Sequence, residues 1–252
     1  MSIGPEHDPE YQSQHRYGSK HSASERLVVD RCYPDAMPIY AKFGKMTGEQ
    51  KYYNKMWTCT HTPVIPMEKP VCTMPKKDCG GATRISILLT RSRTARTATG
   101  PEATVVYAAL VRVLDEIPAD ETHRQDYIND FLAMSKALKQ CQRADGFWNV
   151  SLHDESNFGG KETSGTALFV YGMAWGIRNG LLDRKEYLPV ALKAWNAMTK
   201  EAVHPNGFLG YVQGTGKEPK DGQPVTYKSV PDFEDYGVGC FLLAGTEIYK
   251  LK

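Results

Sequence analysis

Two segments of the chain, 124–141 and 185–201, place large hydrophobic residues three to four positions apart. That spacing puts the residues on one face of an α-helix, so both segments are predicted to be amphipathic helices. The residues expected to face inward are Tyr127, Phe131, Met134 and Leu138 in the first segment, and Leu188, Leu192, Trp195 and Met198 in the second.

Three other segments, 105–117, 166–178 and 236–249, are apolar around most of their circumference. They are predicted to be helices buried on most sides, separated from the amphipathic ones by turns at 145–146, 179–180 and 206–207. Buried helices that alternate with amphipathic ones indicate an all-α protein in two layers. A double-layered helical barrel and a two-layer helical solenoid share this pattern, which favours neither.

The first hundred residues are less regular. Residues 1–27 are polar and aperiodic and are expected to be disordered at least to Ser19. Residues 36–57 read as a helix, a Thr-Gly turn and a second helix, whereas the atypical segment 58–104 contains five prolines and almost no helical spacing. We therefore expect one domain over 28–252, with 58–104 as an unusual insertion.

The net charge of the 252-residue chain is +2, but its basic residues are unevenly placed. Between Lys69 and Thr99, seven Lys or Arg stand against one acid, Asp78, which gives this stretch +6. The stretch lacks the interleaved aromatic residues that stack on bases, so no nucleic-acid partner is expected. A run of 18 apolar residues is also missing, so no membrane partner is expected.

The N-terminus has no apolar core and is not read as a secretory signal, which makes a cytoplasmic location the default expectation. Six scattered cysteines show no second pair at metal-ligand spacing beside Cys72 and Cys79. Neither a zinc site nor a disulfide framework is predicted, and no cofactor is implied.

The polar stretch 145–167 precedes an apolar helix and is the candidate binding site. Glu162, Thr163 and Ser164 either bind a substrate's carboxylate and hydroxyls or simply begin the helix, with Thr163 or Ser164 as N-cap. Trp148 either stacks on a sugar ring or belongs to the core. Further candidates are Asp235 and Tyr236, which cap the last helix or line the pocket; Asp145 is expected to form a turn, and His153 and His61 are weaker candidates.

Six motifs follow one another between Ala108 and Leu251: AALVRVLDEIPAD, DGFWNVSLHD, ETSGTALFVYGMAWGIRNGLLD, YLPVALKAWNAM, VHPNGFLGYVQ and DYGVGCFLLAGTEIYKL. In this order they resemble glycoside hydrolase families 88 and 105, the unsaturated glucuronyl and rhamnogalacturonyl hydrolases. The resemblance implies a six-hairpin (α/α)6 barrel of twelve helices. Because seven or eight helices are counted, the expected fold is a partial barrel that lacks N-terminal helices and exposes part of its apolar inner surface.

The resemblance also implies an activity: removal of a 4,5-unsaturated uronic acid from the non-reducing end of oligosaccharides released by lyases. In such enzymes one Asp protonates the C4=C5 enol ether and activates water for attack at C5, in place of the usual pair of carboxyls. The substrate partner is an unsaturated oligosaccharide, with the rhamnogalacturonan-derived disaccharide favoured.

The sequence departs from the family where that Asp should stand. The family pattern Trp-Trp-x-Asp-x-x-x-Met-Ala-Met-Pro, aligned on Met37-Pro38, places the catalytic position on Arg31. Asp30 and Asp35 are the nearest carboxylates and the candidate catalytic residues. The second family signature, Trp-x-Arg-Gly-Asn-Gly-Trp, is also missing where the chain has 100–106.

Both losses are explained by a hypothesis of shifted reading frames. Residues 27–35 can be encoded so that a one-base shift spells Trp-Trp-Trp-Ile-Asp-Ala-Ile-Gln-Met, and 100–105 so that another frame spells Ser-Arg-Gly-Asn-Gly-Trp. Residues 83–99 can likewise encode an acidic, aromatic loop. Translation of the parent DNA in three frames tests the hypothesis, which fails if these motifs do not emerge.

Two classes of function are consistent with these residues. The first is an enzyme, the unsaturated uronyl hydrolase; the second is an inactive remnant that keeps at most sugar binding. For the lineage we expect hydrolysis, and for the chain as written no activity. A weaker alternative is another six-hairpin sugar enzyme, such as an epimerase.

Overall fold

The computed structural model describes residues 33–61, 100–152, 155–156, 158–214, 222–229 and 234–252. For the helical residues 33–35, 59, 61, 100–102 and 234–235 it describes the backbone only. The chain divides into two units, Met1–Tyr33 and Pro34–Lys252, and all described residues after Tyr33 belong to the second. The expected disorder of 1–27 and most of the atypical segment 58–104 lie outside the described residues.

The described residues are helical, as predicted. The helices are α2 (Tyr33–Thr47), α3 (Gln50–His61), α5 (Gly100–Glu116), α6 (Arg124–Gln140), α7 (Thr163–Arg178), α8 (Arg184–Glu201) and α9 (Glu234–Lys250). Extended pairing in this part of the chain is confined to two isolated bridges, Trp148 with Glu162 and Val203 with Leu209. None of the helices in the described ranges is long and apolar enough to cross a membrane.

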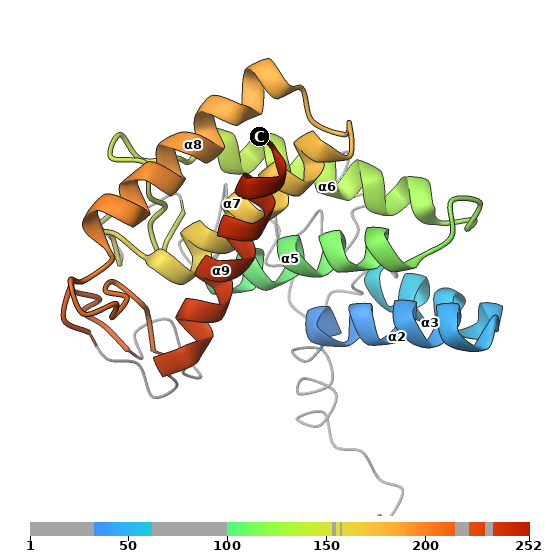
Figure 1. Cartoon of the computed structure of the whole chain (residues 1–252). Helices are drawn as coiled ribbons and strands as arrows, with labels where there is room; N and C mark the ends of the chain where they lie inside the picture. The colour runs from blue at the N-terminus through green and yellow to red at the C-terminus, as the bar shows by residue number, and fades with distance from the viewer. Residues whose placement is uncertain (1–32, 62–99, 153–154, 157, 215–221, 230–233) are drawn as a thin grey trace, which may run out of the picture. The chain divides into compact units, whose positions relative to one another are not determined.

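Helices α5, α7 and α9 all begin on the left of the molecule in Figure 1; α5 and α7 run toward the right, and α9 rises more steeply across α7. Helix α7 packs against α5, α8 and α9, while α6 packs on α5. The amphipathic helices α6 and α8 return the chain between the apolar ones. The apolar helices therefore form an inner layer and the amphipathic ones an outer layer.

Polar contacts place α2 and α3 in the same two layers. The Lys45 ammonium, near the end of α2, lies 2.9 Å from Glu116 Oε2 at the end of α5. The Trp57 indole N–H of α3 donates to Asp126 Oδ2 at the start of α6, 2.8 Å away. Helix α2 thus continues the inner layer beside α5, and α3 continues the outer layer beside α6, so the described part is a partial barrel.

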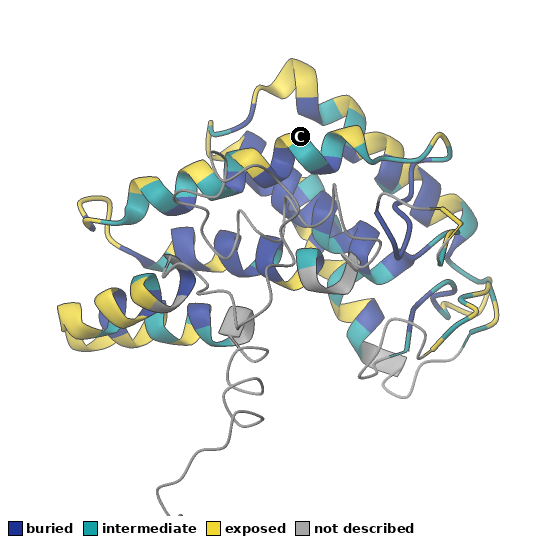
Figure 2. Cartoon of the chain, turned by 180° about the vertical axis from the view of Figure 1, so that it is seen from behind, coloured by how far each residue is buried: buried dark blue, intermediate teal, exposed yellow. Residues whose placement is uncertain are grey.

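Large, fully buried side chains lie on α5, α6 and α7, Tyr107, Phe131 and Phe169 among them, and buried residues are dark blue in Figure 2. Tyr107 of α5 is fully buried, stacks on Phe131 with ring centroids 5.0 Å apart, and shares a 2.7 Å hydrogen bond between its hydroxyl and Ser135 Oγ. Helix α7 approaches so closely at Gly172 that a Cβ there would lie 2.3 Å from Tyr107 Cε1. Glycine is the residue that permits this contact between two inner helices.

The three predicted turns are confirmed, since Gly146, Gly180 and Gly207 each have positive φ, at 98°, 70° and 85°. The helix starts differ from the expected ones. Helix α5 begins at Gly100 and not at Val105, α7 at Thr163 and not at Thr166, and α9 at Glu234 and not at Tyr236. In each case the polar first turn lies before the apolar run from which the helix was predicted.

The inward face of α6 is confirmed, because Tyr127, Phe131, Met134 and Leu138 are all buried. The predicted face of α8 is confirmed at Met198, which is fully buried, and is wrong at Leu192. Its buried residues are Tyr187, Ala191, Ala194, Ala197 and Met198, whereas Leu192 is 36% exposed. Alanine packs against α7 because a small side chain lets two helix backbones approach, and Trp195 stacks instead on Phe241 of α9, 4.7 Å between centroids.

Apolar side chains remain exposed on the helices at both ends of the series. On α9, Val238, Leu242 and Tyr249 are 36%, 61% and 70% exposed. On α2, Phe43 and Met46 are 48% and 73% exposed. Exposed apolar surface was expected of a partial barrel, because helices at the ends of an open series have a neighbour on one side only.

Candidate active site

The start of α7 is organised around the buried carboxylate of Glu162. Its extended backbone makes Glu162 the N-cap, and its two carboxylate oxygens accept from the Ser164 N–H at 2.9 Å and the Gly165 N–H at 2.6 Å. The Ser164 hydroxyl also donates to Oε1 at 2.6 Å. The predicted N-cap, Thr163 or Ser164, is therefore wrong: a longer side chain reaches the free amides from one position earlier.

A fourth donor comes from another part of the chain. The Gln213 N–H lies 3.3 Å from Glu162 Oε1. Burial raises the pKa of Glu162, and the four hydrogen bonds oppose that shift without cancelling it. With both oxygens occupied by the fold, Glu162 holds the site together and is not placed to exchange a proton with a ligand.

Thr163 ties the same point to the 204–213 turn. Its N–H donates to Tyr211 O and its hydroxyl to Gly210 O, both at 2.8 Å. Thr163 is fully buried, so it supports the site from behind. Of the predicted triplet, Ser164 alone is partly exposed.

Helix α9 joins the site through Tyr236. Its hydroxyl donates to the backbone carbonyl of Gln213 and lies beside Ser164. Burial, with a contribution from the negative charge of Glu162, raises the pKa of Tyr236 to about 12. The structure thus brings together three of the predicted residues, Glu162, Ser164 and Tyr236, from two inner helices.

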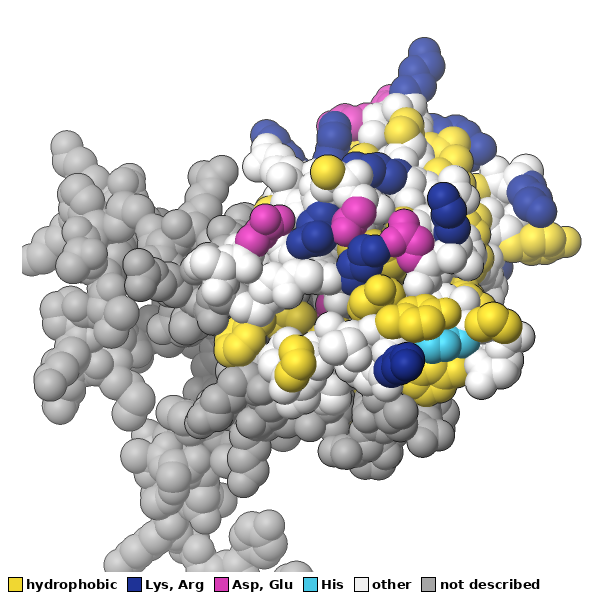
Figure 3. Space-filling view, turned by 90° about the vertical axis from the view of Figure 1, so that its left-hand side faces the viewer, with side chains coloured by type: hydrophobic (Ala, Val, Ile, Leu, Met, Phe, Trp, Pro, Cys, Tyr) yellow, Lys and Arg dark blue, Asp and Glu magenta, His cyan; other side chains and the backbone are white. Residues whose placement is uncertain are grey.

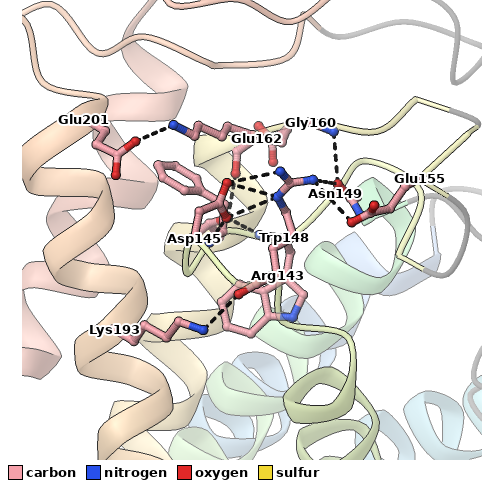
Figure 4. Close-up of polar contacts among 12 residues, drawn as sticks. Arg143, Asp145, Trp148, Asn149, Glu155, Gly160, Glu162, Lys193 and Glu201 are labelled. Atoms are coloured by element: carbon pink, nitrogen blue, oxygen red, sulfur yellow. Dashed lines mark hydrogen bonds and ion pairs between the residues drawn. The ribbon is translucent and has the colours of Figure 1, made fainter.

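A loop network forms the rim beside this point (Figure 4). The Arg143 guanidinium donates to both Asp145 oxygens, at 3.1–3.2 Å, and to Asn149 Oδ1, which also accepts from the Gly160 N–H at 3.0 Å. Glu155 Oε1 lies 3.5 Å from Arg143 Nη1. The network fixes the path of the loop that leads to Glu162.

Asp145 forms the predicted turn, where its Oδ1 accepts from the Phe147 N–H at 3.1 Å. Burial raises its pKa, but the hydrogen bonds from Arg143 and Phe147 and the positive charges of Arg143 and Lys161 outweigh burial and lower the pKa overall.

On the end of the molecule where the inner helices begin, basic and acidic side chains are interspersed (Figure 3).

The sequence left open whether Trp148 stacks on a sugar or belongs to the core, and the structure places it in the core. It is 1% exposed, its indole N–H donates to Leu138 O at 2.8 Å, and its ring meets Phe169 edge-on at 5.3 Å. Neither ring face is open to a sugar in this structure. Trp148 anchors the rim loop to the core between α6 and α7.

The candidate catalytic residues are not placed by the structure. Asp30 and His153 lie outside the described residues, as does Arg31. Asp35 lies in the first turn of α2, Asp235 in the first turn of α9 and His61 at the end of α3, each described by its backbone only. Their roles stay predictions.

The sequence did not single out Arg112, Gln213, Arg143 or Cys240. The structure places them on or beside the inner wall, the layer formed by α5, α7 and α9. Arg112 had a signal that could have been read: it is the only cation in the apolar run 105–117. A single cation in an otherwise apolar helix marks a position at which a partner or a ligand can be sought. Among the described residues, no cluster of three metal-ligating side chains is found, and Cys141 and Cys240 form no disulfide there.

Residues 105–252 match the family model described as Glycosyl Hydrolase Family 88. Two curated relatives are each named Unsaturated 3S-rhamnoglycuronyl hydrolase. The protein from Formosa agariphila is 37% identical over 147 residues, and that from an Alteromonas species is 35% identical over 143 residues. These matches cover 58% and 57% of this chain but 37% and 33% of the relatives, so the chain spans about a third of their length.

Solved structures give the fold. The chain superposes on a glycosyl hydrolase family 88 structure from Bacteroides vulgatus with a TM-score of 0.70 and 30% identity, covering 96% of this chain and 66% of that one. A family 105 glycoside hydrolase from C. acetobutylicum gives a TM-score of 0.61 at 22% identity, over 88% and 64% of the two chains, and shows the fold alone. The described helices are part of a six-hairpin barrel, and the family match spans more than half of the chain, which therefore belongs to Glycosyl Hydrolase Family 88.

Proposed function

We propose that this chain serves the removal of a 4,5-unsaturated uronic acid from the non-reducing end of lyase-derived oligosaccharides. The observation that carries the proposal is the family match over 105–252, which contains α6–α9 and the part of α5 from 105 onward. The first turns of α7 and α9 meet at Glu162, Ser164 and Tyr236. A mouth formed where inner helices begin, rimmed by the Arg143 loop, suits a small anionic sugar.

The substrate favoured is a disaccharide in which the unsaturated uronyl unit is linked to rhamnose. The rhamnogalacturonan-derived disaccharide has this linkage, and the names of both curated relatives combine a rhamnose and a glycuronyl unit. The reaction is hydration of the enol ether: a carboxylic acid protonates the double bond and water attacks C5, after which the ring opens. The carboxyl proposed for this step is that of Asp30 or Asp35.

A second candidate is a chain that binds the sugar without hydrolysing it. It is favoured by the occupation of the described carboxylates near the inner wall. Glu162 caps α7, Asp145 is held by Arg143, and Asp115 accepts the Trp175 indole N–H at 2.8 Å. Glu247 accepts from Arg178 and Lys250. A catalyst would have to come from outside this set.

The two candidates are separated by the ultraviolet absorbance of the enol ether. The purified chain is mixed with the unsaturated uronyl–rhamnose disaccharide and the chromophore is followed with time. Hydrolysis removes the absorbance, and Asp30→Asn or Asp35→Asn then abolishes the loss for whichever residue is catalytic. Binding without loss of absorbance supports the second candidate and refutes the first.

A further inference from the structure

The polar groups at the rim of the inner wall are already engaged by the fold. The Ser164 hydroxyl donates to Glu162, and the Tyr236 hydroxyl donates to the Gln213 carbonyl. Neither hydroxyl hydrogen is left for a ligand without breaking a bond that holds the site together. A ligand that needs donors must find them deeper along the wall.

Arg112 is such a donor. It is an exposed arginine on α5, and within the described part of the chain its guanidinium makes no hydrogen bond and no ion pair within 4.0 Å. An arginine retains its charge at any ordinary pH. The other arginines on and beside this wall differ, since Arg143 is held by Asp145 and Arg178 by Glu247.

The register of the parallel helices α5 and α7 places Tyr171 opposite Arg112. The Trp175 indole N–H of α7 bonds to Asp115 of α5 at 2.8 Å. One turn toward the N-terminus lie Tyr171 on α7 and Arg112 on α5, so the two residues occupy neighbouring positions on adjacent helices. The positive charge of Arg112 opposes the rise that burial causes in the pKa of Tyr171 and of Cys240 on α9, as this placement predicts.

The Tyr171 hydroxyl supplies a second donor. Tyr171 is 8% exposed, and its hydroxyl has no hydrogen-bond partner among the described residues. Burial and the charge of Asp115 raise the pKa of Tyr171 to about 12, which outweighs the opposing effect of Arg112, so the hydroxyl keeps its proton near neutral pH. The two carboxylates nearby already have partners, Asp115 in the Trp175 indole and Glu247 in Arg178 and Lys250, whereas Arg112 is unpaired within the described residues.

We propose that Arg112 and Tyr171 form the anchor for the carboxylate of a uronic acid on the inner wall. The planar guanidinium offers two parallel N–H groups to the two carboxylate oxygens, and the phenol adds a third donor. This inference rests on the proposed function and deepens it, because it assigns substrate anion recognition to α5 and α7 below the rim. Glu162 and Ser164 then act in support and do not contact the carboxylate.

An anchor of this kind selects for charge. A uronic acid fills it with an anion, whereas the methyl ester of the same sugar presents neither charge nor two equivalent oxygens and leaves the guanidinium without a partner. Binding should therefore weaken with salt and fail for the ester.

The test is calorimetric titration of the full chain with the unsaturated uronyl–rhamnose disaccharide and with its methyl ester. Arg112→Gln is expected to weaken binding of the acid at least ~10-fold, as the loss of a charge-assisted bidentate contact predicts. Tyr171→Phe is expected to weaken it about 3-fold and to leave the salt dependence in place, since it removes a neutral donor. Lys136→Gln is the matched control, because it removes the same charge from an exposed position on the outer helix α6.

Equal affinity of the wild type and Arg112→Gln overturns the proposal, as does equal binding of acid and ester or an absence of binding by the wild type. A circular dichroism spectrum and melting midpoint for each variant show whether a loss reflects unfolding. Titration and the absorbance assay report separate quantities. A chain that binds the acid through Arg112 without consuming the chromophore refutes hydrolysis and supports the anchor.

Discussion

Replacement of Glu162 by alanine is expected to destabilise the protein by more than an ordinary N-cap loss. Removal of the carboxylate leaves the Ser164 and Gly165 amides without their acceptor, which costs about 0.5–2 kcal/mol for a helix cap. It also removes the acceptor of the buried Gln213 N–H, and an unsatisfied buried donor costs about 1–3 kcal/mol. The sum is a loss of roughly 1.5–5 kcal/mol.

Asp183 provides the comparison within the same chain. It is the N-cap of α8, but it is exposed and its side chain accepts one backbone bond, from the Glu186 N–H at 2.9 Å. Asp183→Ala should therefore cost about 1 kcal/mol. Urea unfolding followed by far-ultraviolet circular dichroism gives both values under the same conditions.

The difference between the two variants is the decisive quantity. If Glu162→Ala costs no more than Asp183→Ala, the buried carboxylate adds nothing beyond a surface cap, and the account of the α7 start is refuted. A Glu162→Gln variant, which keeps one acceptor oxygen and the side-chain length, should fall between the wild type and alanine.

Contacts elsewhere in the fold predict three further outcomes. Gly172→Ala should lower the free energy of unfolding by about 1–3 kcal/mol, because its Cβ would lie 2.3 Å from the buried Tyr107 ring. Gly239→Ala has nothing within 4 Å of its Cβ and should raise that free energy by about 0.5–1 kcal/mol. Equal urea midpoints for the two variants would contradict this. Burial raises the pKa of Glu247, but hydrogen bonds from Arg178 and Lys250 lower it below its ordinary 4.5, so the stability that Glu247 contributes is present above pH 4.5 and is lost as pH falls through the lower folded pKa. The difference in unfolding free energy between the wild type and Glu247→Gln should therefore shrink with acid, and a pH-independent difference would refute the pairing. Leu242→Lys should reduce the fluorescence of a dye that binds apolar surface, since Leu242 is 61% exposed on α9; unchanged fluorescence would show that the dye binds elsewhere.

The two layers of helices were predictable, because the spacing of hydrophobic residues along the chain indicates how much of each helix is buried. The face of α6 was read correctly from its large residues, since those residues fill the space against α5. The face of α8 was not, because hydrophobic size points to Leu192 while close packing of two helices selects Ala191 and Ala194. Periodicity ranks residues by hydrophobicity and carries no information on how near the neighbouring helix comes.

The sequence predicted several of the residues that come together at the site, but not what each of them does there. Glu162, Ser164 and Tyr236 do come together, which the polar run before an apolar helix indicated. Their division of labour depends on long-range contacts, such as Gln213 to Glu162, that local patterns cannot reveal. Trp148 illustrates the same limit, since a rim tryptophan and a core tryptophan look alike until Leu138 is seen to accept its N–H.

The bonds between the start of α7 and the 210–213 segment decide how the wall can move. Thr163 holds Gly210 and Tyr211, Glu162 holds Gln213, and the Gln213 carbonyl in turn receives the Tyr236 hydroxyl. These bonds link the start of α7 to α9 through the 210–213 segment, so separating the two helices there would break several hydrogen bonds at once. We therefore expect α7 and α9 to move as a unit when a sugar binds, with adjustment to its size coming mainly from α5 and from side chains.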